Sequence, residues 1–225
     1  MSTTRRHQGA ARLDWHRQAL AIGSALTLHF RRKYQRDAAM ITPEAVISVL
    51  NKAKVKFVLM GTYGVEGYRT QPRATQDVDV LVRKADHAKA VRAIRRAFPQ
   101  LEVKDFAVVT RFTDPASQQE VIDLMKPAQD VFKMAFRHTV MVKEGYLIPN
   151  LEMAIISKFA AMTSPHRTQK KKLIDGGDFL DMVEKNLQEI DRTKLRRLAN
   201  KLWAGGGDEI LEHLDDIAAG RPIRF

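Results

Sequence analysis

Hydrophobic residues follow two different periods along this chain, and the period predicts the element that each stretch forms. Short apolar runs, bounded by glycine, proline or polar residues, predict strands at 57–60, 77–82, 106–112 and 120–125, and a hairpin at 139–142 and 146–148. Apolar residues at three- and four-residue spacing predict helices at 43–52, 63–68, 85–98, 128–137, 151–162, 192–203 and 208–218. Strands and helices mix first and helices alone follow, which predicts an α+β fold: a small mixed sheet with flanking helices and a C-terminal helical part.

The first 39 residues fit this pattern least well. They carry +6 of the formal net charge of +12, and the apolar run 19–30 is shorter than the roughly 20 residues that span a bilayer. Thr42 and Pro43 form a clear helix start, so translation from Met40 is an alternative. We therefore expect a poorly ordered basic extension over 1–39, a core over 40–149, a helical part over 150–225, and no membrane association.

The composition limits the chemistry that the chain can perform. The chain has no cysteine, which excludes disulfides, thiolate zinc sites and thiol nucleophiles, and suits the cytoplasm. Any metal must then be held by oxygen or histidine ligands. The basic charge is compatible with a nucleotide or RNA partner, although an ordinary solvated basic surface is an open alternative. The same two alternatives hold for the basic face predicted on the helix over 85–98.

The stretch from Gly61 to Asp79 carries the strongest chemical signal. In a strand, alternate side chains share a face, so Asp77 and Asp79 lie on one face about 7 Å apart and can converge on hard cations. Gly61 allows the backbone to approach a phosphate, and Thr62 adds a hydroxyl donor. This combination predicts a nucleoside triphosphate held between a glycine turn and two magnesium ions.

Gly61-Thr62 followed by Arg73-x-Thr75-x-Asp77-x-Asp79 resembles the minimal nucleotidyltransferases of the polymerase-β-like superfamily, especially the AbiEii-like toxins. The resemblance covers roughly residues 45–185 and implies a nucleotidyltransferase sheet. It implies an enzyme that uses two Mg²⁺ ions to move a nucleoside monophosphate from an NTP to a hydroxyl acceptor. It also implies tRNA or another RNA as acceptor, and a cognate antitoxin as partner.

Three further residues receive candidate roles. Asp123 lies in the middle of an apolar strand, where an unpaired carboxylate is costly to bury, and the resemblance implies that it is the third metal ligand. Capping of the Lys126-Pro127 turn is its alternative role. The resemblance implies that Lys158 contacts the nucleotide phosphates, and Arg73 can reach a phosphate; a lysine that extends to solvent and a solvated arginine are the alternatives.

Two questions stay open from the sequence alone. Asp175 and Asp178 either hold the basic loop over 163–172 or cap a helix. A catalytically inactive nucleotide-binding or RNA-binding module is the alternative to an enzyme. The three carboxylates favour the enzyme, because a cluster of like charges is costly to keep without a cation.

Overall fold

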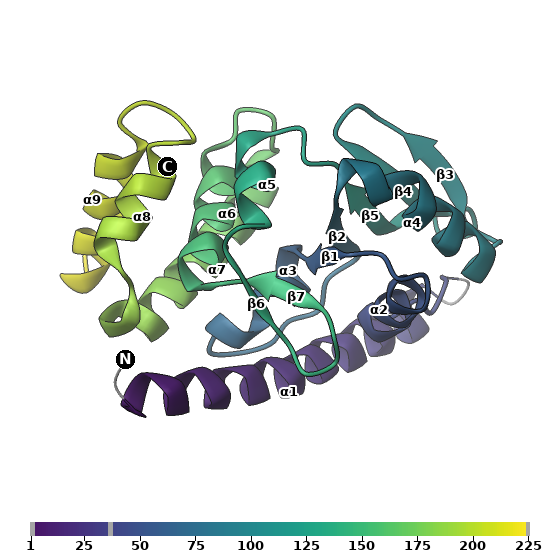
Figure 1. Ribbon diagram of the computed structural model, residues 1–225, viewed down its shortest axis with the longest axis horizontal. Helices are drawn as coiled ribbons and strands as arrows, with labels where there is room; N and C mark the ends of the chain where they lie inside the picture. Colours follow the sequence, from purple (N-terminus) through teal and green to yellow (C-terminus); the bar gives the residue numbers. More distant parts are fainter. Residues whose placement is uncertain (1–2, 36–37, 224–225) are drawn as a thin grey trace.

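The computed structural model describes residues 3–35 and 38–223, and these form a sheet with helices on both faces (Figure 1). The sheet has seven strands in the order β3-β4-β5-β2-β1-β7-β6, with parallel and antiparallel neighbours. The strands are β1 (Phe57–Leu59), β2 (Val78–Val82), β3 (Glu102–Asp105), β4 (Val109–Asp114), β5 (Gln119–Met125), β6 (Thr139–Met141) and β7 (Leu147–Pro149). The mixed sheet of an α+β fold is thereby confirmed.

Helices cover the sheet on both faces and continue beyond it. They are α1 (Thr3–Tyr34), α2 (Pro43–Lys52), α3 (Gly61–Val65), the 3₁₀ helix η1 (Glu66–Tyr68), α4 (Lys84–Ala97), α5 (Asp130–Ala135), α6 (Leu151–Thr163), α7 (Gln169–Asn186), the 3₁₀ helix η2 (Leu187–Glu189), α8 (Arg192–Ala199) and α9 (Gly206–Ala218). The predicted start of α2 is confirmed, since the Thr42 hydroxyl accepts a hydrogen bond from the Ala45 amide at 3.2 Å. None of the described helices is both long and apolar enough to cross a lipid bilayer.

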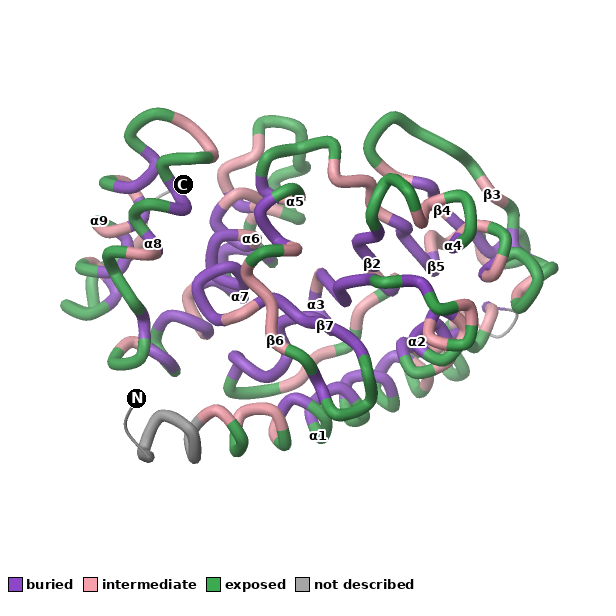
Figure 2. The backbone as a smooth tube through the Cα atoms, viewed as in Figure 1, coloured by how far each residue is buried: buried purple, intermediate pink, exposed green. Residues whose placement is uncertain are grey.

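Two apolar cores lie on opposite faces of the sheet. On one face, α2 and α4 pack over alternate strand residues such as Val80 and Ile122. On the other face, Leu81 belongs to a core that α5, α6 and α7 share with the C-terminal helices α8 and α9. Figure 2 shows the buried backbone concentrated in the sheet, α6 and α7. The carboxylates emerge on this second face, at the boundary of the α5–α7 core.

The N-terminal segment differs from its expected structure. Instead of a poorly ordered extension, residues 3–34 form α1, which runs along one long side of the molecule (Figure 1). His16 and Ala19 are fully buried, and a Cβ added at Gly67 would lie 2.8 Å from the His16 Cβ. Residues 36 and 37 lie outside the described residues. The division of the chain at residues 40 and 150 into separate units stays a prediction.

One predicted strand is wrong in detail. The run 106–112 was expected to be continuous, but the chain reverses there between β3 and β4, and the Phe106 amide donates to the Val109 carbonyl at 2.8 Å. Phe106 and Val108 are exposed at this turn. An apolar turn residue has the same sequence signature as a strand residue, so the pattern alone could not separate the two.

Candidate active site

The three predicted carboxylates meet at the centre of the sheet. Strands β2 and β5 are parallel, and Asp79 is the direct register partner of Asp123. Asp77 directly precedes β2, two residues before Asp79 and on the same side. One oxygen from each of the three side chains lies within 4.8 Å of the others. Three carboxylate oxygens at this spacing fit a hard divalent cation such as Mg²⁺.

The electrostatics of this cluster disfavour its charged form. Burial raises the pKa of Asp79 well above its usual value, and the nearby charges of Asp77 and Asp123 raise it further. Burial and the charge of Asp123 likewise raise the pKa of Asp77, against a hydrogen bond from Thr75, whose hydroxyl lies 3.2 Å from Asp77 Oδ1. Crowded carboxylates repel one another, and a bound cation would relieve that repulsion.

Asp123 has a partner that sequence reasoning missed. Both of its oxygens accept hydrogen bonds from Arg111 on β4, from Nε and from Nη2, each at 2.9 Å. Arg111 is the register partner of Asp123, so its guanidinium lies on the same face of the sheet as the carboxylates. This two-pronged contact fixes the orientation of Asp123. The signal available in the sequence was that Arg111 lies on the predicted strand 106–112, which directly precedes the predicted strand of Asp123 along the chain.

Gly61 approaches the carboxylates more closely than any other residue type could. Its φ of +58° lies in the left-handed region, and a Cβ there would stand 1.9 Å from Asp79 Oδ2. Gly61 is the first residue of α3, directly after β1, and the neighbouring Thr62 is buried. Glycine is therefore required here for both backbone conformation and space. The contact of Gly61 and Thr62 with a phosphate stays a prediction.

A pocket of about 150 Å³ opens beside Gly61 and Asp79. Its other walls come from the loop before α5, from α5 and α6, and from the loop between α6 and α7. Apolar side chains, including Phe132, line one part, while Lys158 and Arg167 supply positive charge. The pocket thus places acidic, basic and apolar groups around one space.

Lys158 and Arg73 are both engaged with carboxylates on α7. The Lys158 ammonium, buried on α6, lies 2.9 Å from Asp175 and 2.7 Å from Asp178. Arg73 donates to both oxygens of Asp178, at 3.1 and 2.8 Å. Burial opposes ionisation of Asp178, but the Arg73 hydrogen bonds and the Lys158 charge outweigh it and hold the pKa of Asp178 below its usual value. Lys158 faces the pocket, whereas Arg73 is directed at α7.

These contacts settle the role of Asp175 and Asp178. Neither caps a helix, because α7 begins earlier, at Gln169, with the Thr168 hydroxyl as its N-cap. Asp175 also pairs with Arg167 of the preceding loop at 2.8 Å and so holds that basic loop, whereas Asp178 contacts Lys158 and Arg73 instead. Arg167, which lines the pocket, received no individual role from the sequence.

No protein-family model matches this sequence, and no curated protein matches it. Solved structures with a similar fold include an antigenic nucleotidyltransferase-like protein from Paracoccidioides brasiliensis, at 15% identity over 78% of this chain and 89% of that chain, with a TM-score of 0.44. The antibiotic-resistance factor ANT(2'')-Ia is 8% identical over 79% of this chain and 95% of its own, with a TM-score of 0.47. JHP933 from Helicobacter pylori is 16% identical over 79% and 92% of the two chains, with a TM-score of 0.42. Because TM-scores below 0.5 are too low to transfer a function, the geometry of the carboxylate cluster is the basis for assigning one.

Proposed function

We propose that this protein is a metal-dependent nucleotidyltransferase that moves a nucleoside monophosphate from an NTP to a hydroxyl acceptor. One observation carries the proposal: Asp77, Asp79 and Asp123 present oxygens within 4.8 Å of one another. Beside this cluster, the Gly61 backbone lies directly against Asp79, because a Cβ at Gly61 would stand only 1.9 Å from Asp79 Oδ2. Three carboxylates on one face are a suitable ligand set for two divalent ions.

In this proposal each residue has a distinct part in the transfer. Asp77 and Asp79 would hold the metal ions, and Asp123 would share in holding them and accept the proton of the attacking hydroxyl. Mg²⁺, when bound, supplies charge stabilisation for the α-phosphate and for the attacking and leaving oxygens. The acceptor oxygen bonds to the α-phosphorus as the bond to pyrophosphate breaks.

Four further residues serve the triphosphate in this proposal. The Gly61 amide and the Thr62 hydroxyl bind phosphate oxygens, and Lys158 adds positive charge from the opposite wall of the pocket. Arg73 contributes indirectly, because it holds Asp178, which in turn holds Lys158.

RNA is the acceptor that the charge of the chain favours, and the 3′ end of tRNA, as the specific candidate, rests on the sequence resemblance. The net charge of +12 supports a polyanionic acceptor over a neutral or cationic small molecule. A toxin role, with a cognate antitoxin as partner, rests on the sequence resemblance alone.

Transfer of a radioactive label from an NTP to RNA tests the proposed function. The pure protein is incubated with each α-³²P-labelled NTP, Mg²⁺ and total RNA, and we expect label in the RNA with one of the four nucleotides. The Asp77→Asn/Asp79→Asn double variant should transfer none. Its matched control is Asp208→Asn/Asp215→Asn, which removes two exposed carboxylates on α9 and should transfer normally. Undiminished transfer by the Asp77/Asp79 variant would refute the proposal.

An inactive nucleotide-binding module is the second candidate, and one observation favours it. Arg111 already satisfies both oxygens of Asp123, so the cluster is partly neutralised without a cation. Such a module would be stabilised against thermal unfolding by an NTP yet transfer no label to any acceptor.

A further inference from the structure

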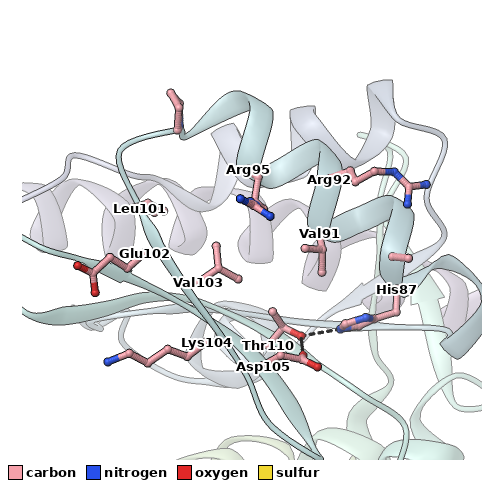
Figure 3. Close-up of a pocket in the computed structure, with 12 residues that line it drawn as sticks. His87, Val91, Arg92, Arg95, Leu101, Glu102, Val103, Lys104, Asp105 and Thr110 are labelled. Atoms are coloured by element: carbon pink, nitrogen blue, oxygen red, sulfur yellow. Dashed lines mark hydrogen bonds between the residues drawn. The ribbon is translucent and has the colours of Figure 1, made fainter.

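A second, larger cavity lies between α4 and the edge strand β3 (Figure 3). Its volume is about 930 Å³, and its lining includes Val91, Arg92, Arg95, Leu101, Val103 and Thr110. It lies on the face of the sheet opposite the carboxylates, because strand residues alternate: Lys104, Arg111 and Asp123 are register partners on one face. Val103 points to the other face, under α4. We call this cavity the α4–β3 groove.

The groove combines an apolar floor with an excess of positive charge, because its lining has Arg92, Arg95 and Lys104 against the carboxylates Glu102 and Asp105. Val103 and Leu101 lie at its base, and the Arg95 guanidinium extends from α4 toward them (Figure 3). Within the described part of the chain, neither Arg92 nor Arg95 forms an ion pair. Asp105, a carboxylate of the lining, is already engaged, at 2.8 Å from the Lys126 ammonium.

Along the groove runs an open edge of the sheet. β3 is the terminal strand, paired on one side only, with β4. The Phe106 amide donates to the Val109 carbonyl, and bonded pairs alternate along an antiparallel ladder, so Lys104 is the next residue bonded to β4. The amides and carbonyls of Val103 and Asp105 therefore point outward, away from β4. Such an edge is a template for pairing with another strand.

We propose that the α4–β3 groove binds an extended acidic segment of a partner protein, which adds to the sheet as a strand beside β3. Backbone pairing with Val103 and Asp105 supplies the register. The side chains on the α4 side of the segment, which stand at every second position, then include both apolar residues that pack on the floor and carboxylates that reach Arg92 and Arg95. This site is independent of nucleotidyl transfer, since it lies on the opposite face from Asp123.

The lining of the groove favours an acidic segment over two other occupants, a second copy of the chain and a single-stranded nucleic acid. A second copy of the chain would bring another basic α4 against the first, so like charges would oppose self-association through this groove. A single-stranded nucleic acid would need aromatic platforms for its bases, and no aromatic ring apart from the His87 imidazole lines the groove. His87 is hydrogen-bonded to Thr110 at 2.9 Å.

Fluorescence anisotropy with a defined probe tests the proposal. The probe is a fluorescein-labelled ten-residue peptide with threonine at every second position and with valine and glutamate in turn at the positions between, so that apolar and acidic side chains share one face; we expect saturable binding to the full-length chain. Arg92→Glu/Arg95→Glu should weaken binding at least about tenfold, since two charge-assisted contacts become repulsive. Lys84→Glu/Arg96→Glu is the matched control: it makes the same charge change on exposed positions of α4 outside the groove, and should bind nearly normally.

Two further measurements separate strand addition from simple charge attraction. The same peptide, N-methylated at every second residue on its pairing edge, should not bind, and the unmodified peptide should slow hydrogen exchange at the Val103 and Asp105 amides. Equal binding of the methylated peptide would overturn the proposal, as would failure of the unmodified peptide to bind. Arg92- and Arg95-dependent binding of a ten-nucleotide oligouridylate, as tight as that of the peptide, would instead assign the groove to nucleic acid.

Discussion

At the scale of single residues, Gly61 and Asp79 form the tightest constraint in the site. Gly61 has a left-handed backbone, and its missing side chain is the space that Asp79 occupies. The close approach brings a backbone turn and a carboxylate together with nothing between them. A ligand that binds both a metal on Asp79 and the Gly61 amide can therefore be short, as a phosphate group is.

Gly61→Ala should disrupt this arrangement. The added Cβ must displace Asp79 and also pay for a positive φ, so we expect a loss of about 1–3 kcal/mol in stability. Thermal unfolding with and without Mg²⁺ measures both effects, and stabilisation by Mg²⁺ should shrink. Gly177→Ala is the control: Gly177 is helical, no atom would lie within 4 Å of its new Cβ, and the variant should be unchanged or slightly more stable. A Gly61→Ala protein as stable and as Mg²⁺-responsive as the parent would contradict the prediction.

Glu66 should make stability depend on pH. Burial raises its pKa to about 7, against the positive charge of Arg69, so the folded protein holds a proton that the unfolded chain loses near pH 4.5. A raised pKa means that this contribution is present below pH 4.5 and is lost as the pH rises toward 7. By linkage the loss is roughly 2–3 kcal/mol between about pH 4.5 and 7.5. Glu66→Gln should flatten the decline measured by denaturant unfolding; Glu212→Gln, an exposed control on α9, should not. A decline that is equally steep in Glu66→Gln would show that Glu66 is not its source.

A site residue could be predicted from the sequence when its partners lie close to it along the chain or on a recognisable neighbouring strand. Strand alternation placed Asp77 and Asp79 together, and an aspartate amid the apolar residues of a neighbouring strand indicated Asp123. Asp178 was not identified with its partners, because an ion pair across distant elements leaves no periodic trace in the sequence, whereas the pairing of Arg111 with Asp123 on successive strands was overlooked. The sequence shows which residues carry charge, but the tertiary fold decides which charges meet.

At the scale of elements, α1 shows where patterning fails. Its apolar residues Ile22, Leu26 and Phe30 are exposed, while polar residues on the other side face the core. Hydrogen bonds compensate for this burial: the Tyr63 hydroxyl donates to Thr27 at 3.1 Å, and Arg31 donates to the Ile41 carbonyl at 3.1 Å. A prediction that places the apolar residues of a helix in the core therefore turns the wrong face of α1 toward the core. The strands and the helices α2, α4 and α6 follow the rule, and those were predicted well.

Deleting residues 1–39 should now destabilise the protein rather than leave it intact. The deletion would expose the surface that Ala19 and Leu20 cover and would leave Tyr63 without its hydrogen-bond partner. We expect a melting temperature at least about 5 °C lower, or insoluble protein, in differential scanning calorimetry of the two chains. An unchanged melting temperature would instead support the poorly ordered basic extension expected from the sequence.

At the scale of the whole molecule, the proposed catalytic site and the proposed partner site lie on different faces of the sheet. One face carries the carboxylates and the 150 Å³ pocket, and the other carries the α4–β3 groove with Arg92 and Arg95. Because the sheet separates them, a partner in the groove would leave the carboxylate face accessible. Catalysis and partner binding can therefore be altered separately by mutation.

Salt should distinguish the two classes of acceptor. RNA binding releases counterions from phosphates, so with about four phosphate contacts a rise from about 50 to 200 mM KCl should weaken RNA binding roughly 50-fold. A small neutral acceptor should show little change over that range. Filter binding of labelled tRNA at several salt concentrations gives the slope, and a flat slope would exclude RNA as the acceptor.

Asp178 lies on α7 yet holds Lys158 of α6 and Arg73 of the segment before β2, so one carboxylate links three separate parts of the chain. Lys158, which lines the pocket, is thus already paired with carboxylates before any ligand binds. A singly charged anion such as chloride would attract Lys158 too weakly to separate it from its two aspartates. We therefore expect a polyphosphate, which carries several charges, to compete with these aspartates for Lys158 where a singly charged anion does not.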